Sequence, residues 1–257
     1  MPRYPTLQHT LQLIKHISPS SLNYILDVGA QRETPFLMEQ CKDSFHHLFE
    51  PVTTYHPDLE KNYQDHQIKY KLHKVALSDS DGIAYLHNFS EDHSGRTTHS
   101  YLSFEETYEH SGEYISKDTV NVARLDTILA TETLPDFEYL IKMDVDGLEE
   151  KIVDGGAKTM ANASFVIIEA SLGRRNVISR LKMIEDLGYR LFDICDHAYY
   201  FHQMSQCDLV FINEAYRSQV IKFRPWELVK YKVQWKDWQH GFLDLEKDQL
   251  SDPFGNS

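Results

Sequence analysis

Four acidic residues stand where apolar runs typical of buried strands come to an end. They are Asp27, Glu50, Asp144 and Glu169. In a doubly wound α/β sheet, ligands bind in the crevice outside the carboxyl ends of the strands, so acids at those ends converge on one site. These four carboxylates are therefore the first candidates for a functional site.

Glu50 has the position that an adenosine-containing cofactor requires. A carboxylate at the end of the second strand can accept hydrogen bonds from both ribose hydroxyls. An ordinary acid at a strand end is the competing interpretation. Gly29, just after the first strand, would let the backbone approach a ligand closely, but a single glycine identifies no ligand.

Several fingerprints of other chemistries are missing from the sequence. Without GxGxxG a nicotinamide dehydrogenase is disfavoured, and without GxxxxGK[ST] or GxSxG the P-loop enzymes and serine hydrolases are excluded. No HExxH motif occurs, and His46 and His47 face opposite sides of their strand, so no metal site is predicted. His93 and His99 remain open as an acceptor contact or a ligand pair.

The apolar runs alternate with helical patterns along most of the chain, which indicates a mostly parallel central sheet. The last two strands are joined by too short a segment for a crossover helix, so we expect them to be antiparallel. Ile68 to Leu77 and Ile83 to Phe89 suggest a strand pair at a sheet edge. The predicted strands of the main sheet are 24–29, 45–49, 139–143, 165–169, 189–194 and 209–212.

Three regions are expected. Residues 1–21 form an amphipathic helical cap, residues 22–213 the main domain, and residues 214–257 an aromatic-rich extension. The extension is interpreted as a cap, with a homodimer contact or an acceptor platform as alternatives. Ser90 to Asp118 shows little periodicity, and we expect a lid or insertion loop there.

The charge balance limits the partners. A formal net charge of -13 argues against nucleic acid and anionic membranes as partners, and it favours a neutral small molecule. The three cysteines form no CxxC pair, which argues against a disulfide framework. No apolar run is long enough to span a bilayer and no secretory signal is present, so we expect a cytoplasmic protein.

An ordered set of short motifs carries a family resemblance. The motifs run from ILDVGA at 25–30, through FEP at 49–51, VALSD at 75–79, LD at 125–126 and IKMDVDGLE at 141–149, to VIIE at 166–169 and QCDLVF at 206–211. Each motif is weak alone, but their order and spacing resemble the FkbM methyltransferase family over residues 22–213.

The resemblance implies S-adenosylmethionine as the methyl donor and O-methylation of a sugar, a glycan or a small metabolite. It also implies a class I methyltransferase fold, a Rossmann-like α/β sheet of seven strands whose last strand is antiparallel. The cofactor-binding residues that it implies surround the ribose-binding Glu50 and line the methyl-transfer centre; they are Asp27, Gly29, Ala30, Gln31, Glu50, Pro51, Ser78, Asp79 and Asp144.

The acceptor hydroxyl must lose a proton during such a transfer, and a positioned carboxylate can take it. Asp144 is the first candidate for this base and Glu169 the second. Asp144 could instead only bind the cofactor, and Glu169 could only close a helix N-terminus. A divalent cation held by Asp144, Asp146, Glu149 and Glu169 is a further alternative.

Two positions depart from the family pattern. Asp146 replaces a glutamate, which is a conservative exchange. Glu33 stands where the family commonly has glycine, and its side chain either turns outward, pairs with the amino group of the cofactor, or obstructs the pocket. Obstruction would leave an inactive methyltransferase-like module that binds a glycan or protein partner.

Overall fold

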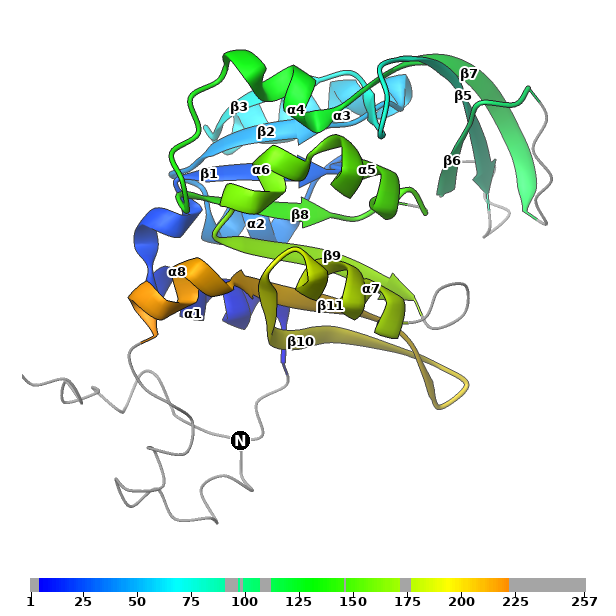
Figure 1. Cartoon of the computed structure of the whole chain (residues 1–257). Helices are drawn as coiled ribbons and strands as arrows, with labels where there is room; N and C mark the ends of the chain where they lie inside the picture. Colours follow the sequence, from blue (N-terminus) through cyan, green and yellow to red (C-terminus); the bar gives the residue numbers. More distant parts are fainter. Residues whose placement is uncertain are drawn as a thin grey trace, which may run out of the picture.

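The computed structural model describes residues 5–90, 97, 99–106, 112–145, 147–171 and 177–221. Its centre is a seven-stranded sheet in the order β10-β11-β9-β8-β1-β2-β3 (Figure 1). The first five strands in the chain that belong to it are parallel: β1 (Tyr24–Val28), β2 (Phe45–Phe49), β3 (Lys69–His73), β8 (Tyr139–Met143) and β9 (Phe165–Ser171). The expected doubly wound α/β fold is confirmed.

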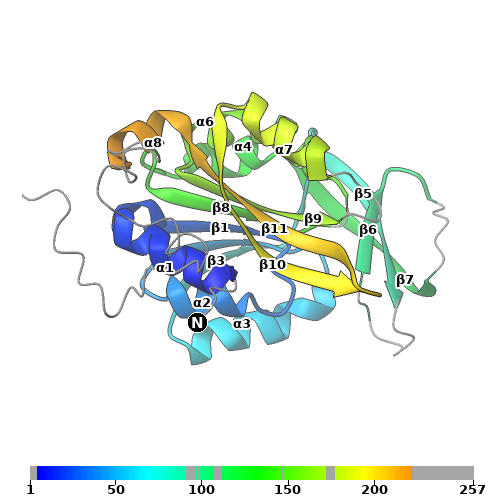
Figure 2. The same cartoon turned by 90° about the horizontal axis from the view of Figure 1, so that it is seen from below.

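Helices cover both faces of this sheet (Figure 2). One face carries α1 (Leu7–Ile17), α2 (Pro35–Gln40) and α3 (His56–Asp65). The other carries α4 (Leu125–Ile128), α5 (Glu149–Gly155), α6 (Ala157–Asn162) and α7 (Val177–Asp186). Short 3₁₀ turns, 19–22, 53–55 and 129–131, complete the connections.

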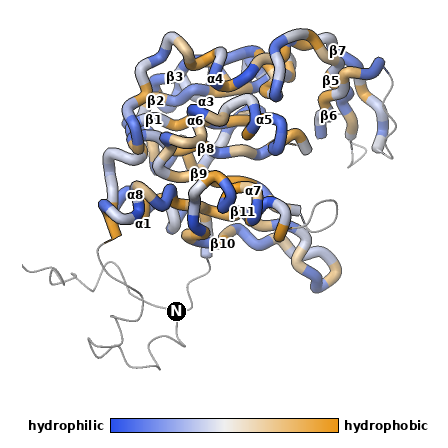
Figure 3. The backbone as a smooth tube through the Cα atoms, viewed as in Figure 1, coloured by the Kyte–Doolittle hydropathy of each residue, from blue (hydrophilic) through white to orange (hydrophobic). Residues whose placement is uncertain are grey.

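The alternation of side chains along each strand divides the core into layers. In β1, Ile25 packs with Leu11 and Leu37 of the first helical layer, whereas Leu26 packs toward Ile152 and Met160 of the second. Strands buried on both faces read as continuous apolar runs, which is why their positions could be predicted. Figure 3 shows the hydrophobic colouring along β9 and β11, inside the sheet.

The last two strands form a long hairpin. β11 (Gln203–Asn213) pairs antiparallel with both β9 and β10 (Tyr189–Tyr200), as predicted. α8 (Glu214–Val220) follows β11, and the rest of the 214–257 extension lies outside the described residues. None of the described helices combines the length and apolarity that crossing a membrane requires.

A second, smaller sheet corrects two predictions. It contains β4 (Ala76–Leu77), β7 (Glu113–Ala123), β5 (Gly82–Ser90) and β6 (His99–Ser103), in that order. The predicted pair at a sheet edge was wrong, because β3 ends the large sheet whereas β5 pairs with β6 and β7. The loop predicted from Ser90 to Asp118 was also wrong where it covers β6 and the first half of β7. His93 lies outside the described residues.

Candidate active site

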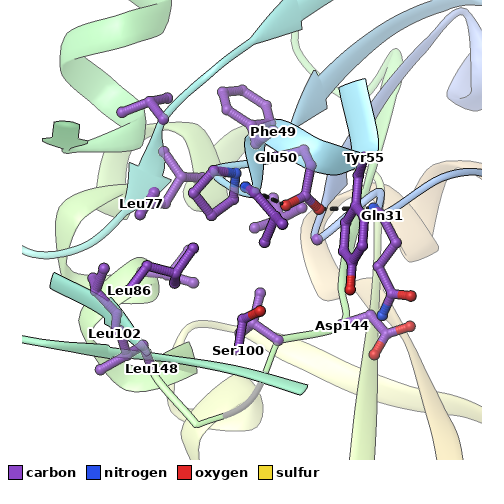
Figure 4. A pocket seen from close by; sticks show the side chains of 18 residues that line it. Gln31, Phe49, Glu50, Tyr55, Leu77, Leu86, Ser100, Leu102, Asp144 and Leu148 are labelled. Carbon is purple, nitrogen blue, oxygen red and sulfur yellow. Dashed lines mark hydrogen bonds between the residues drawn. The ribbon is translucent and has the colours of Figure 1, made fainter. Parts of the chain in front are cut away.

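A cavity opens at the carboxyl ends of β1, β2 and β8, where the small sheet faces the large one. It encloses about 710 Å³, including the part that is open to solvent. Leucines gather on one side of it and polar side chains on the other (Figure 4). The lining residues are Val28, Gly29, Gln31, Phe49, Glu50, Pro51, Val52, Tyr55, Val75, Ala76, Leu77, Leu86, Ser100, Leu102, Asp144, Val145, Leu148 and Ile152.

Glu50 lies at the end of β2 with only 2% of its surface exposed. Its Oε2 accepts a hydrogen bond from the backbone N–H of Gln31 at 2.8 Å, and its Oε1 accepts one from Val52 at 2.7 Å. Burial raises the pKa of Glu50 to about 7, although the two N–H donors oppose the rise. Its carboxylate is thus held in a fixed orientation at the wall of the cavity.

The turn after β1 positions the backbone N–H of Gln31 that donates to Glu50. Gly29 has a φ of +85°, and a Cβ on it would lie 2.1 Å from the carbonyl oxygen of Asp144. The N–H groups of Gly29 and Ala30 both donate to the carbonyl of Phe49, which ties this turn to the end of β2. Only glycine combines this backbone conformation with such close packing, which explains why a glycine occupies position 29.

Asp144 follows β8 and lines the cavity beside Gly29. Lys142 donates from its Nζ to the Oδ2 of Asp144 at 2.8 Å, and its side chain is only 7% exposed. Burial disfavours the charge on Lys142, but the carboxylates of Asp144 and Asp27 more than offset it and raise its pKa. The lysine therefore remains a cation that orients Asp144.

Five predicted site residues do not line the cavity. Asp27 is buried, with its Oδ2 accepting from the Thr34 hydroxyl at 2.6 Å, and burial raises its pKa. Ala30 packs in the core. Ser78 is buried and donates to the exposed Asp79 at 3.1 Å.

Glu169, the fifth, contacts the side-chain amide of Gln206 across β9 and β11. Gly29, Gln31, Glu50, Pro51 and Asp144 do line the cavity.

Sequence reasoning missed the residues that the small sheet and its neighbours contribute. Tyr55, Leu86, Ser100 and Leu102 all line the cavity. The two-residue spacing of Ser100 and Leu102 is the strand signal that could have revealed these two residues.

Glu33 points away from the cavity. Its side chain is exposed, and its Oε2 accepts from Asn62 at 3.4 Å. The neighbouring Arg32 pairs with Asp58 at 3.3 Å and lies over the ring of Tyr55. Of the three outcomes considered for Glu33, the structure shows the outward one.

Among the described residues, the acids considered as ligands of a divalent cation do not form a cluster. Glu149 is buried in an ion pair with Arg180, and Asp146 lies outside the described residues. Within the described ranges, no group of three or more His, Cys, Asp or Glu side chains is arranged to hold a metal ion.

Comparison with known proteins identifies one family and several solved structures of low sequence identity. The family model described as Methyltransferase FkbM domain matches residues 27–191. No curated protein matches the chain.

Three solved structures are similar over most of the chain. One is the precorrin-6y C5,15-methyltransferase of Geobacter metallireducens (11% identity, 78% of this chain, 87% of that chain, TM-score 0.40). The second is the TehB-like SAM-dependent methyltransferase of Corynebacterium glutamicum (12%, 79%, 86%, 0.39). The third is the magnesium protoporphyrin IX methyltransferase of Synechocystis, solved with bound SAM (8%, 80%, 79%, 0.42). These distant similarities support no conclusion about an acceptor.

Proposed function

Because this chain belongs to the FkbM methyltransferase family and is thus an S-adenosylmethionine-dependent enzyme, we propose that it methylates a hydroxyl group of a sugar, a glycan or a small metabolite. S-Adenosylmethionine supplies the methyl group from its sulfonium centre. The residues of this chain bind the cofactor, orient the acceptor and receive a proton.

The carboxylate of Glu50 is the observation that supports the cofactor site of this proposal. It lines the cavity, and each of its oxygens accepts one backbone N–H and has further acceptor capacity. A ribose offers two adjacent hydroxyl donors, which match the two oxygens. The leucine side of the cavity provides an apolar surface for a base, so the lining fits an adenosine group.

Asp144 is the residue that we assign to the acceptor hydroxyl. It lies in the same cavity as Glu50, and Lys142 holds one of its oxygens. A carboxylate oriented in this way can accept the proton of a hydroxyl, which contributes about 10²–10⁴-fold to a rate. Holding the hydroxyl in line contributes more, up to roughly 7–11 kcal/mol. Glu169 is the weaker candidate because it does not line the cavity.

The alternative of an inactive binding module depended on Glu33 obstructing the pocket. Its side chain points to Asn62 instead, and it does not line the cavity. The obstruction therefore has no support in the geometry.

Calorimetric titration with S-adenosylmethionine and with S-adenosylhomocysteine tests the cofactor site. We expect saturable binding in the wild type and in the matched control Glu33→Ala. We expect at least about tenfold weaker binding in Glu50→Ala, because charge-assisted hydrogen bonds to the ribose are lost. Equal binding in both variants would place the cofactor elsewhere.

Transfer of labelled methyl groups to a pool of hydroxyl compounds tests the acceptor class. An O-methyl ether as product supports the proposal. Methylation of nitrogen or carbon instead would refute it.

A further inference from the structure

The hairpin of β10 and β11 extends beyond the rest of the large sheet. Gln206 is the first residue of β11 that pairs with β9, opposite Ser171, whereas the pairing of β10 with β11 continues to Tyr200 and Gln203. β10 runs parallel to β9, because each is antiparallel to β11. The hairpin tip therefore projects past the carboxyl ends of the parallel strands, at the same edge of the sheet as the cavity (Figure 1).

Three consecutive aromatic side chains are exposed at this tip. Tyr199 is 67% exposed, Tyr200 70% and Phe201 84%. The ring centroids of Tyr200 and Phe201 lie 4.5 Å apart with the ring planes at 72°, so the two rings form a corner. Aromatic side chains stabilise a fold when they are removed from water, and these three are not. Their contribution to folding is therefore small.

The turn holds Phe201 in a backbone conformation that disfavours a large side chain. The hairpin closes through Phe201 and His202, whose φ angles are +46° and +65°. A two-residue hairpin loop with positive φ at both positions favours Asn-Gly, because a bulky side chain is strained there. Stability alone would thus favour a different residue at position 201. Exposure and strain together indicate that the rings serve a ligand.

The chemistry around the rings matches an uncharged, hydroxyl-rich ligand. Residues 197–207 contain no Lys, Arg, Asp or Glu, in a chain whose formal net charge is -13. The exposed His202 and Gln203 stand beside the rings and offer neutral hydrogen-bonding groups. Ring faces can pack on the C–H groups of a sugar while these side chains bind its hydroxyls. Insertion of the tip into a bilayer would instead bury His202 and Gln203 without hydrogen-bond partners.

The separation between the tip and the methyl-transfer centre calls for a chain of sugar units. The registers of β8 with β9 and of β9 with β11 place Asp144 close to level with Glu169 and Asp208. From Asp208 to Gln203, β11 continues for roughly 17 Å, and β11 lies two strands from β8, which adds about 10 Å sideways. The tip is thus roughly 20 Å from Asp144. A monosaccharide is several times too short to contact both.

We propose, on the basis of the methyltransferase function argued above, that the tip of the β10–β11 hairpin is a sugar-binding subsite and that the acceptor is an uncharged oligosaccharide chain. Tyr200 and Phe201 hold one sugar unit by packing on its ring. His202 and Gln203 bind the hydroxyls of that unit. The chain continues along the carboxyl edge of the sheet to the cavity, where the hydroxyl to be methylated meets Asp144.

Titration followed by saturation-transfer NMR, with S-adenosylhomocysteine present, tests this inference. The probes are malto- and chito-oligosaccharides, from the monosaccharide upward. We expect the affinity to rise with chain length and to level off once the chain spans roughly 20 Å. Equal affinity for short and long chains, or no binding of any probe while S-adenosylhomocysteine still binds, would overturn the inference. Failure of S-adenosylhomocysteine to bind would instead overturn the proposed function on which it rests.

The Phe201→Asn variant separates a binding role of the ring from a structural one. Asn tolerates the left-handed conformation, so this variant should resist urea at least as well as the wild type. Its affinity for long chains should fall about five- to tenfold, with unchanged affinity for S-adenosylhomocysteine. Long-chain binding equal to that of the wild type would overturn the inference, and a marked loss of stability would assign the ring to folding.

A matched control removes an exposed apolar side chain elsewhere. Ile83 is 66% exposed on β5, and its neighbour Ala84 packs on the inner face of the small sheet, so Ile83 faces outward. Ile83→Ser should therefore leave the affinity for every chain unchanged. An equal loss of affinity in both variants would show that the effect does not arise at the hairpin.

Two other occupants of the tip are distinguished by the same variant. Co-sedimentation of the wild type with phosphatidylcholine vesicles, lost in Phe201→Asn, would assign the rings to a membrane. A dimer in light scattering that Phe201→Asn dissociates would assign them to a second copy of the chain. Either result would overturn the inference.

Discussion

The protonation of Glu50 should make cofactor binding depend on pH near neutrality. Burial raises the pKa of this carboxyl to about 7, and a ribose requires its ionised form as acceptor. From this pKa, about one apo molecule in eleven carries ionised Glu50 at pH 6, against about ten in eleven at pH 8. The apparent affinity for the adenosine group should therefore rise about tenfold between these two pH values.

Calorimetry with 5′-methylthioadenosine measures this effect, because that ligand contains the ribose but lacks the amino-acid tail and its titrating amine. At pH 6, about 0.9 proton should be released on binding, as shown by the dependence of the heat on the buffer. The Glu50→Gln variant should bind weakly with a flat pH profile. A flat profile in the wild type, or the same slope in both proteins, would show that ionisation of Glu50 does not control binding of the ribose.

The same raised pKa has a consequence for stability. The pKa of Glu50 in the folded state lies above its ordinary value of 4.5, so the folded protein holds the proton of Glu50 more tightly than the unfolded chain does. The stabilisation that results is present in full below pH 4.5 and is lost as the pH rises through about 7. Relative to Glu50→Gln, the free energy of unfolding of the wild type should fall by roughly 3 kcal/mol between pH 4.5 and pH 8. Urea denaturation of the apo proteins across this range measures the difference. A constant difference would contradict the burial of a charged Glu50.

Three further substitutions have defined outcomes. Gly29→Ala should abolish cofactor binding or folding, because its Cβ would lie 2.1 Å from the carbonyl oxygen of Asp144. The control Gly82→Ala, whose Cβ would have no atom within 4 Å, should unfold in urea like the wild type. Similar behaviour of the two variants would contradict close packing at Gly29. Lys142→Met should lose up to about 3 kcal/mol in urea denaturation, because the buried Asp27 and the one-third exposed Asp144 lose their cation. Lys182→Met, at an exposed pair, should lose about 0.5 kcal/mol or less. Asp144→Asn should lower the methyl-transfer rate about 10²–10⁴-fold in single-turnover assays with little change in S-adenosylhomocysteine affinity; an unchanged rate would exclude it as the base.

The central sheet could be predicted because its strands are buried on both faces. Continuous apolar runs such as those of β8 and β9 leave a clear signal, and chain order then determines the carboxyl ends where Glu50 and Asp144 lie. The position of an acid at a strand end did not, however, determine which way its side chain points. Asp27 shares the face of Ile25 and points beneath α2 to Thr34, so this strand-end acid is buried outside the cavity.

Strand β5 of the small sheet was predicted, but β6 and the pairing of the sheet were not, because half of its inner face is polar. β5 and β6 alternate leucines with Asn88 and Ser100, and they pair across segments rich in serine and histidine. Their partner β7 lies about 30 residues away in the chain from β5, so pairing depends on long-range contacts that local patterns do not contain. The wall of the cavity that would contact the acceptor therefore emerged only from the structure.

A crystal structure with S-adenosylhomocysteine tests the central assignment most directly. We expect the ribose hydroxyls to lie within hydrogen-bond distance of the two carboxylate oxygens of Glu50, with the sulfur on the side of Gly29 and Asp144. A nucleoside bound elsewhere, or a ribose that does not contact Glu50, would contradict it.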